Sequence, residues 1–164
     1  MKTRSLTIAA AVAAAYAALT LLGDSFGLTF GPVQCRFAEA LCVLPFLLPE
    51  SAWGLAVGCF AADLFSPYGL LDMIVGPLIT LCAALLTARC RRKWLAPLPP
   101  VVLNAVCIGA LTAWEQTGGS SAFAAAWGWN TLTVAAGEAI ACYGLGALLL
   151  WRLPMLPNFR DLQR

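Results

Sequence analysis

The sequence from position 6 to position 22, LTIAAAVAAAYAALTLL, contains no charged residue and only three residues with a hydroxyl group. A helix that crosses the hydrocarbon core of a bilayer, about 30 Å thick, needs about 20 predominantly apolar residues. Lys2 and Arg4 precede the run, as in a signal peptide, but the run is longer than the usual apolar core of such a peptide, about 7–15 residues. We therefore predict a retained membrane helix over 6–22.

The rest of the chain has the same apolar character. Of its 164 residues, 61% are hydrophobic and 11% are charged, whereas an average soluble domain has roughly 45–50% and about 25%. A soluble domain of this size cannot bury so much apolar surface in one core. The predicted fold class is an all-α integral membrane protein, a bundle of six transmembrane helices in a single domain over 1–164. These helices are expected at 6–22, 37–48, 52–65, 71–88, 99–115 and 129–151.

The second and third of these segments are short for a membrane crossing. They are either tilted or form a re-entrant hairpin that turns at Pro49, Glu50 and Ser51. In both arrangements the chain returns to the side from which it came.

Basic residues decide the predicted orientation, because cytoplasmic loops of membrane proteins are rich in Lys and Arg. With the N-terminus inside, nine of the ten basic residues are cytoplasmic and only Arg36 lies on the outer side. We therefore predict that both termini and the 89–93 loop are cytoplasmic. The outer loops, at 23–33, 66–72 and 116–129, are rich in turn residues and indicate a lid or a binding mouth on that side. The nine inner residues are Lys2, Arg4, Arg89, Arg91, Arg92, Lys93, Arg152, Arg160 and Arg164.

Several classes of function are excluded by what the sequence lacks. Without histidine, a His-based triad and an HExxH zinc site are impossible. The seven cysteines form no CxxC pair and are interpreted as small packing residues. No GxxxxGK[ST] loop is present, so ATP would have to be bound by separate chains. Ten basic against eight acidic residues give no basic face for nucleic acid. We predict no catalytic residue, no cofactor and no metal.

Charged residues within the apolar segments are the main candidates for function, because charge in a membrane is costly. Arg36 and Glu39 are three residues apart and can pair on one helix face. The alternative is a structural ion pair, which fits Arg36 better than the deeper Glu39. Glu138, in TVAAGEAIACYGLG, has no cationic residue within a helical turn. It needs either a partner on another helix or a ligand that donates hydrogen bonds.

Four further residues are candidates with a structural alternative each. Asp72 lies at the expected N-terminus of a helix, where a negative charge also interacts favourably with the helix dipole. Asn104 is a lone amide in an apolar helix, and interhelical hydrogen bonds of this kind are common in membrane bundles. Trp127 and Trp129 are either interfacial anchors or aromatic faces for a flat ligand.

Alanines at helical spacing form smooth stripes on the first helix, and small residues at this spacing allow helices in lipid to approach closely. We predict that the stripe through Ala10, Ala14 and Ala18 docks a partner protein. Ala9, Ala13 and Ala17 form a second stripe with the same spacing, and the alternative to docking is packing within the chain.

Four segments together resemble the QueT family, whose members are substrate-binding S components of energy-coupling-factor (ECF) transporters. They read AYAALTLL, GPVQCRFAEALCVLP, WGLAVGCFAADLFSPYGLLDMIVGPLITLCAALL and GEAIACYGLG, and the resemblance covers about 15–146. The resemblance implies a multi-pass protein of the prokaryotic cell membrane that works with the transmembrane coupling protein EcfT and two ATPase subunits. The alanine stripe is similar to the one that docks on the coupling protein. The family pattern has an amide where this chain has Asp63, so the resemblance assigns that position no detailed role.

The resemblance also implies a queuosine precursor as substrate, namely 7-aminomethyl-7-deazaguanine or a close relative. One carboxylate can accept its N1–H and 2-amino groups, an amide or guanidinium can donate to its carbonyl oxygen, and its ammonium needs a second carboxylate. Six acids against one arginine in the outer half favour a cationic ligand. The expected binding residues are Gln34, Arg36, Glu39, Asp72, Asn104, Trp127, Trp129 and Glu138.

Three alternatives to this function remain open. One is an S component for another small cationic, vitamin-like solute. Another is a scaffold subunit without a ligand, which would not need Glu39 and Glu138 in its apolar segments. The third is an intramembrane enzyme, for which no GxSxG or Ser/His motif is present.

Overall fold

A computed structural model describes residues 3–27, 36–67, 69–157 and 159. The described residues are helical and contain no strand, which confirms the all-α class. The elements follow one another as α1 (Thr3–Ser25), η1 (Phe37–Phe46), α2 (Ser51–Asp63), α3 (Gly69–Arg89), η2 (Lys93–Leu95), α4 (Leu98–Leu103), η3 (Asn104–Ile108), α5 (Gly109–Thr117), α6 (Phe123–Ala139), η4 (Ile140–Gly146), α7 (Ala147–Arg152) and η5 (Leu153–Met155).

The described residues form six helical segments, and four of these are long and apolar enough to cross a membrane. These four are Thr3–Ser25, Gly69–Arg89, Lys93–Thr117 and Phe123–Met155. The second segment, η1, is a 3₁₀-helix of 10 residues, and the third, α2, is an α-helix of 13 residues. At 2.0 and 1.5 Å per residue, each is about 20 Å long, which is shorter than the bilayer core. The cytoplasmic location of the termini stays a prediction.

One expected helix start is wrong by several residues. The helix expected at 99–115 begins with α4 at Leu98 and ends with α5 at Thr117, close to its expected bounds. The helix expected at 129–151 already begins at Phe123 and continues to Met155. The outer loop expected at 116–129 is therefore much shorter. Gly118 and Gly119, with φ of 58° and 77°, end α5 in the left-handed region. The alanines that follow favour helix, so the chain turns back at once into α6.

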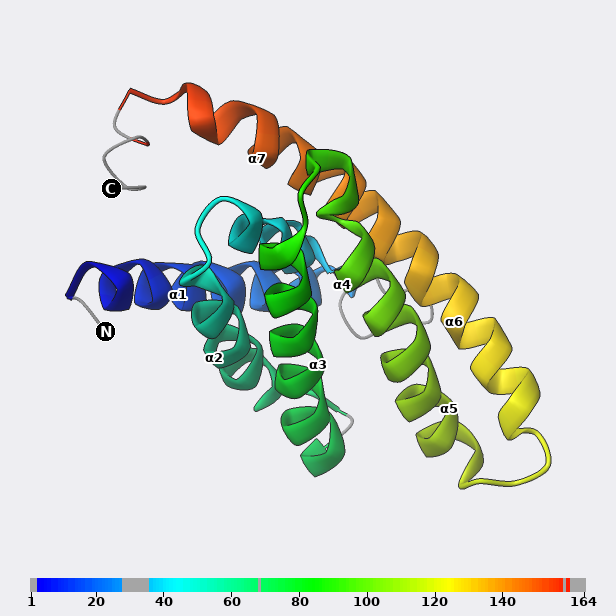
Figure 1. The fold of residues 1–164 in the computed structure, drawn as a ribbon. Helices are drawn as coiled ribbons and strands as arrows, with labels where there is room; N and C mark the ends of the chain where they lie inside the picture. Colours follow the sequence, from blue (N-terminus) through cyan, green and yellow to red (C-terminus); the bar gives the residue numbers. More distant parts are fainter. Residues whose placement is uncertain (1–2, 28–35, 68, 158, 160–164) are drawn as a thin grey trace.

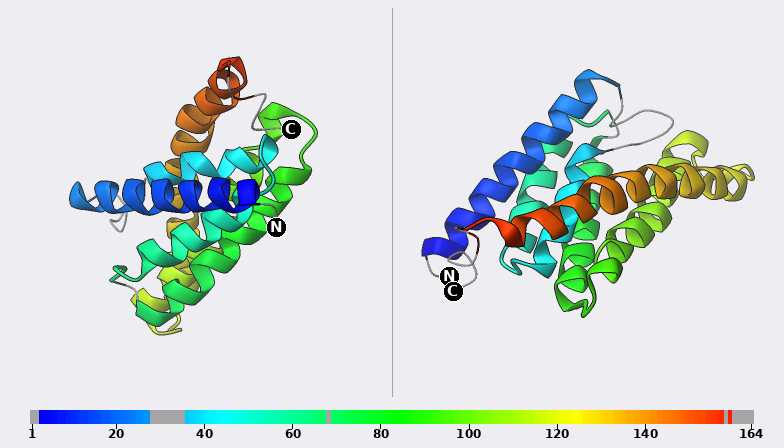
Figure 2. Two further views of the ribbon diagram at one scale, coloured as in Figure 1. Left: turned by 90° about the vertical axis from the view of Figure 1, so that its left-hand side faces the viewer. Right: turned by 90° about the horizontal axis from the view of Figure 1, so that it is seen from above.

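The helix α1 lies across α2, as Figures 1 and 2 show, and it also contacts η1. It approaches α2 closely because the facing residues are small. A Cβ atom at Gly54 would overlap the carbonyl oxygen of Ala9, and one at Gly58 would lie 2.6 Å from that of Ala13. The stripe through Ala9 thus packs within the chain, whereas Ala10, Ala14 and Ala18 are exposed.

The short helix η1 lies at the centre of the fold, in contact with α1, α2, α3, η4 and α7. Most of its residues are buried. The long curved helix made of α6, η4 and α7 passes along one side of it (Figure 1). Two segments of π-helix, η3 and η4, interrupt the last two long helices. Such π-helical segments are often found at functional sites.

Candidate functional site

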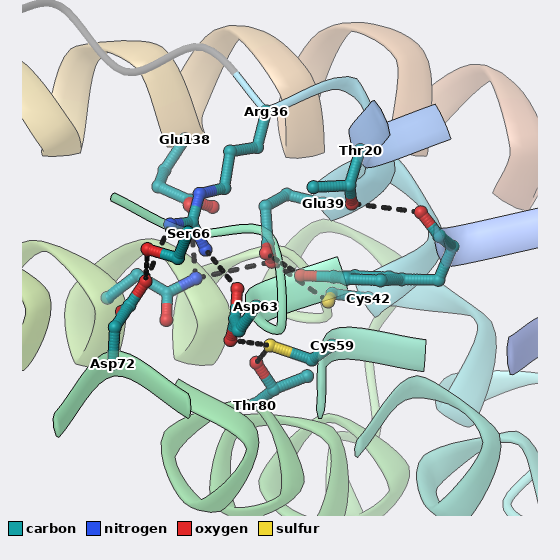
Figure 3. A network of polar contacts seen from close by, with 12 residues as sticks. Thr20, Arg36, Glu39, Cys42, Cys59, Asp63, Ser66, Asp72, Thr80 and Glu138 are labelled. Carbon is teal, nitrogen blue, oxygen red and sulfur yellow. Dashed lines mark hydrogen bonds and ion pairs between the residues drawn. The ribbon is translucent and has the colours of Figure 1, made fainter. Parts of the chain in front are cut away.

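Four carboxylates and one guanidinium meet in the interior of the protein (Figure 3). Arg36 and Glu39 come from η1 and the residue before it, Asp63 from the end of α2, Asp72 from the first turn of α3, and Glu138 from α6. All five are buried, with at most 6% of their surface exposed. Charged residues are this deeply buried only when other groups compensate for the loss of water.

Glu39 accepts hydrogen bonds from three different elements. The hydroxyl of Tyr16, on α1, donates to Oε1 in a short hydrogen bond. Oε2 accepts from the thiol of Cys42 at 3.0 Å and from Nδ2 of Asn104 at 3.2 Å. Glu39 thereby ties α1 and η3 to the central helix η1.

Asn104 also connects Glu39 with the second glutamate. The same Nδ2 atom donates to Oε1 of Glu138 at 3.0 Å, and the thiol of Cys142 lies 3.7 Å from Oε2 of Glu138. Asn104 is the first residue of η3, and Glu138 lies just before η4. The two π-helical segments therefore flank the residues that bridge the two long helices.

Arg36 and the two aspartates form the other half of the cluster. Nη1 of Arg36 lies 4.0 Å from Oδ1 of Asp63, and Nη2 lies 3.9 Å from Oδ2 of Asp72. The hydroxyl of Ser66 donates to Oδ2 of Asp72 at 2.6 Å. The thiol of Cys59 donates to Oδ2 of Asp63 at 3.1 Å. Within the described part of the chain, Oδ1 of Asp63 and Oδ1 of Asp72 accept no hydrogen bond.

The cluster carries more acidic than basic groups. Four carboxylates face one guanidinium, and the other partners among the described residues are neutral hydroxyl, thiol and amide groups. A buried surplus of negative charge is costly unless a cation or protons neutralise it. The arrangement is therefore suited to a small cationic ligand that donates several hydrogen bonds. Among the described residues, no group of three or more His, Cys, Asp or Glu side chains has the geometry of a metal site.

The structure brings five of the eight predicted binding residues together and leaves two elsewhere. The five are Arg36, Glu39, Asp72, Asn104 and Glu138. Gln34 lies outside the described residues. The two tryptophans are not part of the cluster: Trp127 stacks on Phe123 and donates Nε1–H to the carbonyl of Val106, and Trp129 is 67% exposed. A role of Trp127 and Trp129 in binding remains a prediction.

Three kinds of residue in the cluster were not predicted from the sequence. Tyr16 is a lone tyrosine in an alanine-rich helix, and its buried hydroxyl needs a partner, which was the available signal. Asp63 lies near the end of the helix expected at 52–65, where an acid does not by itself indicate a binding role. Cys42 and Cys142 were interpreted as packing residues, yet their thiols contact the two glutamates.

Comparison with known proteins agrees with the resemblance found in the sequence. The family model described as QueT transporter matches residues 6–154. No curated protein and no solved structure matches the chain.

Proposed function

Because the chain belongs to the QueT transporter family, we propose that it is the substrate-binding subunit of an ECF-type importer in the prokaryotic cell membrane. It captures a queuosine precursor from outside, with 7-aminomethyl-7-deazaguanine as the expected ligand. Partner subunits then supply ATP-driven uptake, namely the transmembrane coupling protein EcfT and two ATPases. Because the sequence contains no GxxxxGK[ST] loop, ATP-driven uptake would require ATPases on separate chains.

The observation that supports ligand capture is the buried acidic cluster. A carboxylate offers about four lone-pair positions. Glu39 already accepts three hydrogen bonds from the chain, whereas Glu138 accepts one from Asn104 and one long contact from Cys142. Glu138 therefore has more remaining capacity to accept the N1–H and 2-amino groups of a 7-deazaguanine. The role of Glu39 in this proposal is to hold the site together.

The exposed alanines on α1 support docking to the coupling protein. The seam between α1 and α2 already uses Ala9 and Ala13, which face Gly54 and Gly58. Ala10, Ala14 and Ala18 remain on the outer surface of α1. A smooth surface of small residues allows another membrane helix to approach closely.

The test begins with the ligand itself. Mass spectrometry of the purified chain identifies any small molecule that copurifies with it. Copurification of a 7-deazaguanine base would support the proposal. Copurification of a different cationic solute would support the S-component role but contradict the proposed substrate.

Calorimetry then tests the site, with 7-aminomethyl-7-deazaguanine as the titrant. Glu138→Gln replaces an acceptor by an NH₂ group and leaves ligand donors unpaired, at a cost of about 1–3 kcal/mol or more. We expect binding to weaken at least about tenfold. Glu50→Gln, at the turn between η1 and α2, is the matched control and should bind like the wild type. Equal affinities of all three proteins would place the site elsewhere.

A further inference from the structure

We propose that Asp63, together with Asp72, is the subsite that selects a ligand by its positive charge. This inference rests on the proposed function and assigns the ligand's ammonium group to a specific pair of residues. Neither the family pattern nor the sequence alone gave Asp63 a role in binding.

The free acceptor atoms of the cluster belong to the aspartates. Each carboxylate oxygen of Glu39 and Glu138 accepts at least one hydrogen bond from the chain. By contrast, Oδ1 of Asp63 and Oδ1 of Asp72 accept none from the described residues, although both side chains are at most 2% exposed. A buried acceptor without a donor is destabilising by about 1–3 kcal/mol. An ammonium group has three donors and can satisfy both oxygens.

The charges of this half of the cluster lead to the same assignment. The two carboxylates face one guanidinium, so one negative charge is left over. The ion pairs with Arg36 measure 4.0 and 3.9 Å, whereas charge-assisted hydrogen bonds between nitrogen and oxygen measure about 2.7–2.9 Å. Arg36 therefore makes no close hydrogen bond to Asp63 or Asp72 through these atoms. One additional monovalent cation would balance the pair.

Asp63 is held in place by contacts that do not involve a ligand. Its Oδ2 accepts from Cys59, whose sulfur in turn accepts from the hydroxyl of Thr80 at 3.4 Å. Its carboxylate also packs against the backbone of α3 at Gly76, where a Cβ atom would lie only 2.6 Å from Oδ2. Oδ2 is thus used for positioning, and Oδ1 remains directed at Arg36 (Figure 3).

The experiment compares two ligands that differ in one charge. The first is 7-aminomethyl-7-deazaguanine, and the second is 7-ethyl-7-deazaguanine, its neutral isostere with a methyl in place of the ammonium. We expect the wild type to bind the amine at least about tenfold more tightly. In Asp63→Asn, one carboxylate balances one guanidinium, so we expect this preference to fall to within about threefold. Asp72→Asn removes the same surplus charge and is the second variant, in case one of the two does not fold.

Glu138→Gln is the matched comparison, because it should weaken both ligands by a similar factor and keep the preference for the amine. The subsite is overturned if the wild type binds both ligands equally. It is also overturned if Asp63→Asn and Asp72→Asn weaken both ligands by the same factor, as a purely structural role would require. Failure of the wild type to bind either ligand instead overturns the proposed substrate, and the subsite with it.

Discussion

Asp63 reaches the cluster because the residue on which it packs has no side chain. Gly76 lies in α3, one turn after Asp72, and its Cα occupies the position next to the Asp63 carboxylate. A glycine inside a helix is ordinarily unfavourable by about 1 kcal/mol relative to alanine. At this position the glycine makes room for a buried charge.

Gly76→Ala should therefore affect binding more strongly than stability. The new methyl group pushes Asp63 away from Cys59 and Arg36, so we expect affinity for 7-aminomethyl-7-deazaguanine to fall at least about fivefold. The melting temperature in detergent should fall only modestly, because the gain in helix propensity, about 1 kcal/mol, offsets part of the cost of displacing a buried carboxylate. Gly144→Ala is the control, since a Cβ there meets nothing within 4 Å. Equal binding by both variants would show that the position of Asp63 does not matter.

For single residues, the sequence predicts those members of the site whose polar side chains are costly to place in a membrane. Glu39, Asn104 and Glu138 stand out because each is a polar residue in an apolar segment, and all three are in contact. Asp63 stands at a helix end, where an acid needs no special explanation. Its contact with Arg36 depends on how α2 and η1 pack, and a single sequence does not contain that information.

Among the elements, α1 uses two neighbouring stripes of alanine for different contacts. One stripe meets the glycines of α2, and the other is exposed. Both have the same spacing and composition, so the sequence alone could not separate them. The same limit applies to η1: a mostly apolar run predicts a helix at 37–48, but it does not distinguish a 3₁₀-helix that ends at Phe46 from an α-helix.

Leucine substitutions should distinguish the two stripes. Ala14→Leu adds bulk to the exposed face, so we expect the yield of complex with the coupling protein and ATPases to fall several-fold, while ligand binding by the isolated chain is kept. Ala9→Leu adds the same bulk against Gly54 and should lower the melting temperature of the isolated chain, because overpacking costs about 1–3 kcal/mol. Copurification and thermal denaturation measure the two effects. Normal assembly of Ala14→Leu would contradict the docking surface.

For the whole molecule, the predicted orientation can be tested at the loop between α3 and α4. Arg92 is exposed, so Arg92→Cys should react with a membrane-impermeant maleimide in inverted vesicles and not in intact cells. The native cysteines are first replaced. Cys90 would otherwise be a slow background site, because burial raises the pKa of its thiol. Labelling of position 92 from outside intact cells would reverse the predicted topology.

The polar cluster also has a consequence for the order in which the protein is synthesised. Its members extend from Tyr16 to Cys142, so the ribosome makes Glu39 long before Asn104 and Glu138 exist. In the growing chain, the described donors to Glu39 that are already present are Tyr16 and Cys42. The interior is completed only when the last long helix arrives. A chain that ends prematurely before α6 would leave Asn104 without one of its two acceptors and would expose unfinished polar surface to lipid, where membrane proteases can recognise it.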